Sequence, residues 1–130
     1  MGKTRAKAVV LDAGALIAFE RADARMRALV REALRGGMRL VVPAGVLGQV
    51  WRGGSRQTIL RSLVSGPTTA VPALDQLLAE AAGVLCGRSG TSDVVDASVV
   101  LTARREHAVV VTSDVDDLRR LDPGLALERI

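Results

Sequence analysis

The stretch Ala8-Val9-Val10-Leu11-Asp12 is a short apolar run that ends in an acidic residue. A second run, over residues 108–112, has the same character and leads through Ser113 to Asp114. Continuous Val and Leu runs without polar alternation are typical of strands that are buried on both faces of a parallel sheet. We therefore predict two buried parallel strands, each followed by an aspartate.

Helical and apolar segments alternate on both sides of these strands. We predict helices over residues 13–19, 24–35, 44–51, 55–64, 74–86, 92–106 and 116–121, and further strands over 40–42, 68–71 and 126–129. Strands separated by helices favour a parallel sheet with helices on both faces. A chain of 130 residues has room for one domain, here residues 1–130. The predicted fold class is α/β, with a central parallel sheet of four to five strands between two helical layers.

The amino-acid composition argues against several classes of protein. The chain has one cysteine, Cys86, so it forms no internal disulfide, and we expect a small buried residue in a protein of the reducing cytoplasm. No apolar stretch approaches the length of a membrane span, which predicts a protein without a membrane partner. The aromatic residues are Phe19 and Trp51 alone, too few for a module that reads RNA by base stacking.

Charge is distributed unevenly along the chain. Residues 1–66 carry 12 basic and 4 acidic residues, a net charge of +8, whereas residues 67–130 carry 6 and 10, a net charge of −4. Five arginines cluster on and after one predicted helix: Arg25, Arg27, Arg31, Arg35 and Arg39. They form either a stripe that contacts RNA phosphates or the ordinary solvated face of a helix.

Four aspartates are candidates for one site. Asp12 and Asp114 follow strands of the same predicted sheet, and parallel strands place their carboxyl ends at one edge, where ligands bind. Asp93 and Asp96 lie three residues apart near the start of a helix, and so share a face. Each could instead be a helix cap or a first-turn acid. Gathered together they would repel one another unless a cation neutralised them.

The donor types indicate which cation such a site would take. Carboxylate oxygens, without nearby His or Cys, favour Mg²⁺ or Mn²⁺ over zinc. Such an ion lowers the pKa of an attacking water and contacts phosphate oxygens, so we predict phosphodiester hydrolysis. The hydroxyls of Thr112 and Ser113 would either orient a water or phosphate there or serve as polar residues at a strand end. His107, the only histidine, ends a predicted helix, and we expect it to cap that helix.

Three segments together resemble the PIN-domain nucleases, notably the VapC-type toxins of bacterial toxin–antitoxin pairs. They are Val9–Ala13, Asp93–Ala97 and Val110–Leu118, in the family's order and covering essentially the whole chain. The resemblance implies a metal-dependent endoribonuclease, a homodimer, and a small antitoxin that inhibits it. It also implies that Asp12, Asp96 and Asp114 hold the metal, with Asp93 and Asp117 in support and Asp116 as the second choice for the accessory acid.

The chain departs from that family at one position. The family usually places a glutamate in the helix after the second strand, and Gln49 stands there instead. An amide oxygen can ligate weakly or orient a water, but it brings no negative charge. The alternative is therefore a catalytically degenerate module that binds RNA or protein without cutting. We expect Trp51, two residues further on, to pack in the core or a dimer interface.

Overall fold

A computed structural model describes residues 6–130 of the chain. In this range the backbone forms five strands, β1 (Ala8–Leu11), β2 (Arg39–Val41), β3 (Thr69–Ala70), β4 (Ala108–Thr112) and β5 (Leu127–Arg129). All are parallel and lie in the order β3-β2-β1-β4-β5. The predicted α/β class and parallel sheet are confirmed, with β1 at the centre and β4 beside it.

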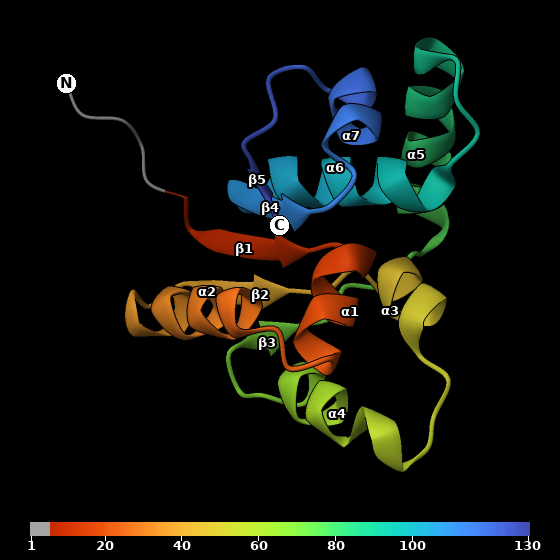
Figure 1. The fold of residues 1–130 in the computed structure, drawn as a ribbon. Coiled ribbons are helices and arrows are strands. Elements are labelled where there is room, and N and C mark those ends of the chain that lie inside the picture. Colours follow the sequence, from red (N-terminus) through yellow and green to blue (C-terminus); the bar gives the residue numbers. More distant parts are fainter. Residues whose placement is uncertain (1–5) are drawn as a thin grey trace, which may run out of the picture.

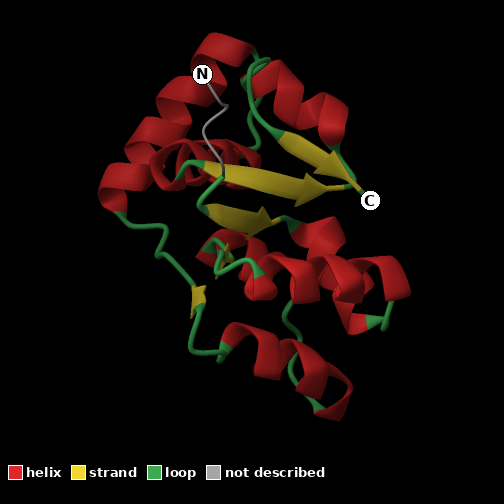
Figure 2. Cartoon of the chain, turned by 90° about the vertical axis from the view of Figure 1, so that its left-hand side faces the viewer, coloured by secondary structure: helices red, strands yellow, loops and turns green. Residues whose placement is uncertain are grey.

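Seven α-helices are described within residues 6–130 and cover both faces of the sheet, giving the three expected layers. They are α1 (Ala13–Glu20), α2 (Ala24–Arg35), α3 (Ala44–Val50), α4 (Thr58–Val64), α5 (Gln76–Ser89), α6 (Val94–Glu106) and α7 (Val115–Leu121). The helices α1 and α2 pack on one face, whereas α6 packs on β1 and β4 and carries α5 and α7 outside it. Figure 2 shows helices on both sides of the strands.

The core follows from the apolar runs. Every residue of β1 is buried, and so is most of β4. The register pairs Val9 with Val109 and Leu11 with Val111, so the two strands end side by side. In Figure 1, β1 and β2 point toward the side of the molecule where α1 and α3 begin. Residues that follow these strands are thereby placed at a common edge of the sheet.

Several predicted boundaries are corrected by capping. The fourth predicted helix splits into a 3-10 turn, Ser55–Gln57, and then α4, because Gln57 is buried and its side chain bonds the preceding loop. The fifth predicted helix, over residues 74–86, begins later than predicted, at Gln76 behind its N-cap Asp75. It also ends later, at Ser89, and is followed by Gly90 in the left-handed conformation. The sixth begins after Asp93, which caps it, and the seventh begins at Val115.

The two central strands and α2 have their predicted bounds, and α4, α6 and α7 end where predicted. The ends of α1, α3, β2, β3 and β5 that differ do so by one residue. His107 ends α6 with a left-handed φ of +52°, as expected of a capping residue. Cys86 is buried, and its thiol donates to the carbonyl of Asp93. Trp51 is half-buried against the core. No helix within residues 6–130 has the length and apolar character needed to cross a membrane.

Candidate active site

Asp12 lies where β1 meets α1, and its carboxylate is held by two hydrogen bonds. One oxygen accepts from the backbone N–H of Ala13 at 2.8 Å, which caps the helix. The other accepts from the hydroxyl of Thr112 at 2.9 Å. The residue is only 2% exposed. The capping role that we considered for Asp12 is thus real, and it fixes the carboxylate at the carboxyl edge of the sheet.

Thr112 connects the acids that follow the two central strands. It is the last residue of β4 and is fully buried. Its hydroxyl donates to Asp12 and accepts from the backbone N–H of Asp114 at 2.8 Å. Because the hydroxyl proton is already used on Asp12, Thr112 acts as a positioning residue that ties the two strand ends together.

Ser113 comes next and is exposed at the same edge. Its side chain lies against the first turn of α1: a Cβ added at Gly14 would come within 2.2 Å of the Ser113 Oγ and 3.0 Å of its Cβ. Only a glycine at position 14 leaves room for this close approach. The turn after β4, which carries Asp114, is therefore pressed against the helix that Asp12 caps.

Two further acids come from the start of α6. Asp93 is the N-cap, and its Oδ1 accepts from the backbone N–H of Asp96 at 2.9 Å. The Asp96 side chain is half-buried, and among residues 6–130 no hydrogen bond reaches its carboxylate. A buried charge without a donor is unfavourable, which marks Asp96 as the acid of this site that most needs a positive partner.

The pKa values show that the acids influence one another through space. The pKa of Asp96 rises to about 7, first because of burial and then because of the negative charges of Asp93, Asp12, Asp114 and Asp117. Burial also raises the pKa of Asp12, although its hydrogen bonds oppose the change; Asp114 and Asp93 raise it further. Acids at distant positions of the sequence therefore gather at one end of the sheet.

Two small pockets open at this edge. One, of about 140 Å³, is lined by Asp93, Asp96, Asp117 and Arg120, among others. The other, of about 180 Å³, is lined by Ser113, Asp114, Asp116 and Asp117. Asp117 lines both pockets, which supports the choice of Asp117 over Asp116 as the accessory acid.

Arg120 was missed in the sequence analysis. It lines the 140 Å³ pocket beside three of the acids. The signal was available, because Arg120 follows Asp117 by three residues in α7 and residues at that spacing share a helix face. A guanidinium at the rim of an acidic pocket is suited to contact a phosphate that bridges to the site.

The donor set fits a hard divalent cation. All five acids offer oxygen ligands, and the pKa of Asp96 is raised first by burial and then by the neighbouring carboxylates, both of which favour a cation beside it. Within residues 6–130, no three acidic, His or Cys side chains surround a common point as a formed metal site would. Carboxylates would have to turn toward one another to complete a coordination shell.

Gln49 lies apart from these pockets. It is exposed on α3 and lines a different pocket, of about 350 Å³, whose other residues include Arg21, Arg52 and Arg56. None of the five aspartates lines that pocket. The expectation that Gln49 orients a water beside the acids remains a prediction.

A family model describes the same chain. The PIN domain model matches residues 9–123, which include every aspartate of the site. The chain belongs to the PIN domain family. The match ends before β5, so the fifth strand lies outside the matched part of this PIN domain.

Solved structures show that the fold of this PIN domain is shared at low sequence identity. A chain of VapBC2 from Rickettsia felis, bound to a DNA fragment from their promoter, has a TM-score of 0.71 at 16% identity, over 94% of this chain and 98% of that one. A chain of FitAB bound to the IR36 DNA fragment has a TM-score of 0.63 at 13% identity, over 93% and 94%.

A third structure, FitAcB from Neisseria gonorrhoeae, has a TM-score of 0.62 at 14% identity, over 92% of this PIN domain and 95% of that chain. Among curated proteins, no significant match was found. Because nearly all of both chains is covered, the shared fold extends over almost the full length of each related chain.

Proposed function

We propose that this PIN domain is a divalent-metal-dependent endoribonuclease that acts as the toxin of a VapC-type toxin–antitoxin pair. The observation that carries the proposal is the electrostatic coupling of Asp96 to Asp12, Asp93, Asp114 and Asp117 at the carboxyl edge of the sheet. A site that hydrolyses an anionic backbone with the help of a bound cation needs several carboxylates to hold that cation.

In this proposal Asp12, Asp96 and Asp114 hold Mg²⁺ or Mn²⁺, and Asp93 and Asp117 support it. The bound cation would activate water and offset negative charge on the phosphodiester. Asp12 contributes a carboxylate whose orientation is set in advance by Thr112 and Ala13.

The carboxyl group of Asp96 changes its protonation state near neutral pH. With a pKa of about 7, its carboxyl holds a proton for much of the time in the metal-free protein. A neighbouring cation favours the ionised form, so metal binding would release that proton. The site is therefore expected to bind metal better at higher pH.

The partners follow from the resemblance and from the related structures. VapBC2 and FitAB are two-component complexes on DNA, and this chain shares the fold of one component. We propose a small antitoxin as protein partner, a homodimer as the assembled toxin, and RNA as substrate. With a single cysteine, the chain suits the reducing cytoplasm, where we place the reaction.

Cleavage of a mixed RNA pool tests the proposal. We expect cleavage that requires Mg²⁺ or Mn²⁺ and is lost in Asp114→Asn, whose side chain makes no capping hydrogen bond that the change could break. Asp75→Asn is the matched control, because Asp75 caps α5 away from the site and asparagine also caps helices. RNA that stays intact at every metal concentration would overturn the proposed activity and favour a binding module.

A further inference from the structure

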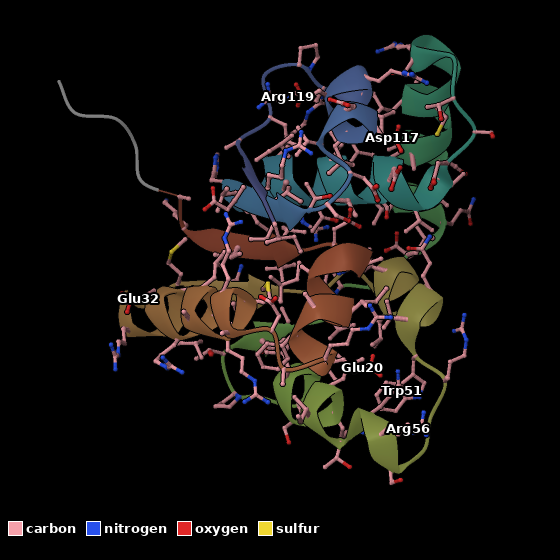
Figure 3. The ribbon with its side chains drawn as sticks, viewed as in Figure 1. Glu20, Glu32, Trp51, Arg56, Asp117 and Arg119 are labelled. Atoms are coloured by element: carbon pink, nitrogen blue, oxygen red, sulfur yellow. The ribbon has the colours of Figure 1, made fainter. Side chains whose placement is uncertain are left out.

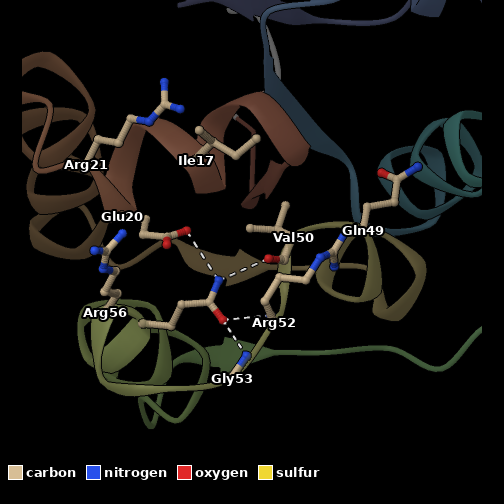
Figure 4. A pocket seen from close by; sticks show the side chains of 9 residues that line it. Ile17, Glu20, Arg21, Gln49, Val50, Arg52, Gly53 and Arg56 are labelled. Atoms are coloured by element: carbon tan, nitrogen blue, oxygen red, sulfur yellow. Dashed lines mark hydrogen bonds between the residues drawn. The ribbon is translucent and has the colours of Figure 1, made fainter.

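The pocket of about 350 Å³ beside α1 is lined by none of the five aspartates assigned to the metal in the proposed function. It lies between the end of α1, the end of α3 and the 3-10 turn, and Figure 4 shows the side chains around it. Arg21, Arg52 and Arg56 line it together with Gln49, and we call it the arginine pocket. Its only acidic residue is Glu20.

The three guanidinium groups of the arginine pocket lack acidic partners. The ion pairs formed within residues 6–130 involve Arg35, Arg39, Arg104 and Arg105 only. Three arginines against Glu20 leave an excess of two positive charges around the pocket. Uncompensated guanidinium groups around a pocket favour an anion, and their planar donors match phosphate oxygens.

The loop that carries two of these arginines is rigidly supported. The Gln57 side chain is buried, and its Oε1 accepts from the backbone N–H groups of Arg52 and Gly53 at 2.8 and 2.9 Å. Its Nε2 donates to the carbonyl of Val50 at 3.0 Å and to Glu20 at 3.4 Å. Dashed lines in Figure 4 mark these hydrogen bonds, which end at the labelled Glu20, Val50, Arg52 and Gly53.

The backbone conformation of two glycines also sets the shape of this loop. Gly53 and Gly54 have φ values of +78° and +91°, which side chains other than glycine rarely adopt. A loop whose shape is already set loses little conformational entropy when a ligand binds.

The arginine pocket also lies within reach of the acids. The helix α1 begins next to Asp12 and is followed directly by Arg21. Eight helical residues span about 12 Å at 1.5 Å per residue, a distance that a few nucleotides cover. In the view of Figure 3, Asp117 lies on one side of α1 and Arg56 on the other, beyond Glu20 at the end of this helix.

We propose that the arginine pocket binds a backbone phosphate of single-stranded RNA a few nucleotides from the bond that is cut. This inference rests on the proposed function, because it takes RNA as the substrate. Arg21 and Arg56 are the contacting residues to test, since neither side chain makes a hydrogen bond or ion pair within residues 6–130. Arg52 is less suitable, because it also bonds the carbonyls of Gly48 and Trp51.

Salt dependence of RNA binding tests the inference without requiring cleavage. Fluorescence anisotropy with a labelled 20-nucleotide single-stranded RNA, in EDTA, gives Kd as a function of KCl. Each lost phosphate contact lowers the slope of log K against log salt by about 0.7. Because both arginines contact the same phosphate in this proposal, we expect for Arg21→Gln with Arg56→Gln a slope smaller by about 0.7, which at 0.1 M salt corresponds to roughly fivefold weaker binding.

Two further variants serve as controls. Arg88→Gln with Arg105→Gln removes the same charge from exposed positions of α5 and α6, and we expect it to leave the slope within experimental error. Arg21→Lys with Arg56→Lys keeps the charge, and we expect it to retain most of the salt dependence. Thermal melting followed by circular dichroism verifies that each variant is folded.

The outcomes separate the pocket from the proposed function. If the glutamine pair binds RNA as the wild type does, or no worse than the control pair, while the wild type cleaves RNA, the pocket assignment is overturned and the nuclease stands. If the wild type neither binds nor cleaves RNA, both are overturned. If a labelled glutamate-rich peptide binds through these arginines while RNA binding is insensitive to them, the pocket belongs to an acidic protein partner.

Discussion

The substitution Asp96→Asn should stabilise the metal-free protein at neutral pH while abolishing cleavage. The pKa of Asp96 is raised from 3.8 to about 7, so ionising it in the folded protein costs free energy. At about 1.36 kcal/mol per pKa unit, the full shift corresponds to roughly 4 kcal/mol. Asp96 is only half-buried, and solvent screening reduces the expected gain to about 1–3 kcal/mol.

The sign of the pH dependence follows from proton linkage. Between about pH 4 and pH 7 the folded protein binds a proton at Asp96 that the unfolded chain has lost, so the free energy of unfolding falls as the pH rises through this window. Asparagine does not titrate. The stability difference between variant and wild type should therefore be near zero at pH 4, grow toward pH 7 and stay constant above it.

Chemical denaturation in EDTA at pH 4 to 8 measures this difference, and Asp75→Asn, at an exposed cap remote from the site, should show no such pH dependence. Adding Mg²⁺ at pH 8 should stabilise the wild type by about 2.7 kcal/mol at a concentration 100 times its Kd, and the variant by much less. A variant less stable than the wild type at pH 8, or a difference independent of pH, would refute the reasoning.

Three other substitutions probe the site and the core. Thr112→Val removes the hydroxyl that orients Asp12. We expect a free energy of unfolding lower by about 1–3 kcal/mol in denaturant titrations at pH 7, together with slower RNA cleavage. Unchanged stability and unchanged cleavage would contradict the positioning role. Gln49→Glu adds a carboxylate at the family's acidic position, and we expect the Mg²⁺ concentration for half-maximal cleavage to fall about tenfold. An unchanged Mg²⁺ concentration would show that position 49 does not face the metal. Thr102→Val replaces a fully buried hydroxyl that has no hydrogen-bond partner among residues 6–130. We expect the melting temperature to rise, by an amount that corresponds to roughly 1 kcal/mol of stability, and a lower melting temperature would contradict this.

Most of the fold could be predicted from the sequence because its central strands are short apolar runs and four of the helices described, α1, α2, α5 and α6, begin behind an aspartate that caps them. The runs that became β1 and β4 stood out by composition, and α2 begins at its predicted residue, behind the cap Asp23. The helix predicted over residues 55–64 was less accurate. Its first turn is 3-10 because Gln57 bonds to a loop before it, and no local pattern reports that contact.

The candidate site could be predicted in outline but not in its energetics. Strand ends identified Asp12 and Asp114, and helical spacing linked Asp93 to Asp96. The arginine pocket escaped the sequence analysis, because its lining comes from the ends of α1 and α3 and from the 3-10 turn. Arg120 shows the opposite case, since its spacing from Asp117 was visible and was not used.

The order of the elements, the parallel character of the sheet and the acids at its edge could be inferred without coordinates, because periodicity, apolar composition and capping patterns are local properties of the chain. The folded arrangement was needed to show that Thr112 bonds Asp12 across 100 positions of the chain and that burial and four other carboxylates raise the pKa of Asp96. Hydrogen bonds and Coulomb interactions depend on distance through space, and the folded backbone sets those distances.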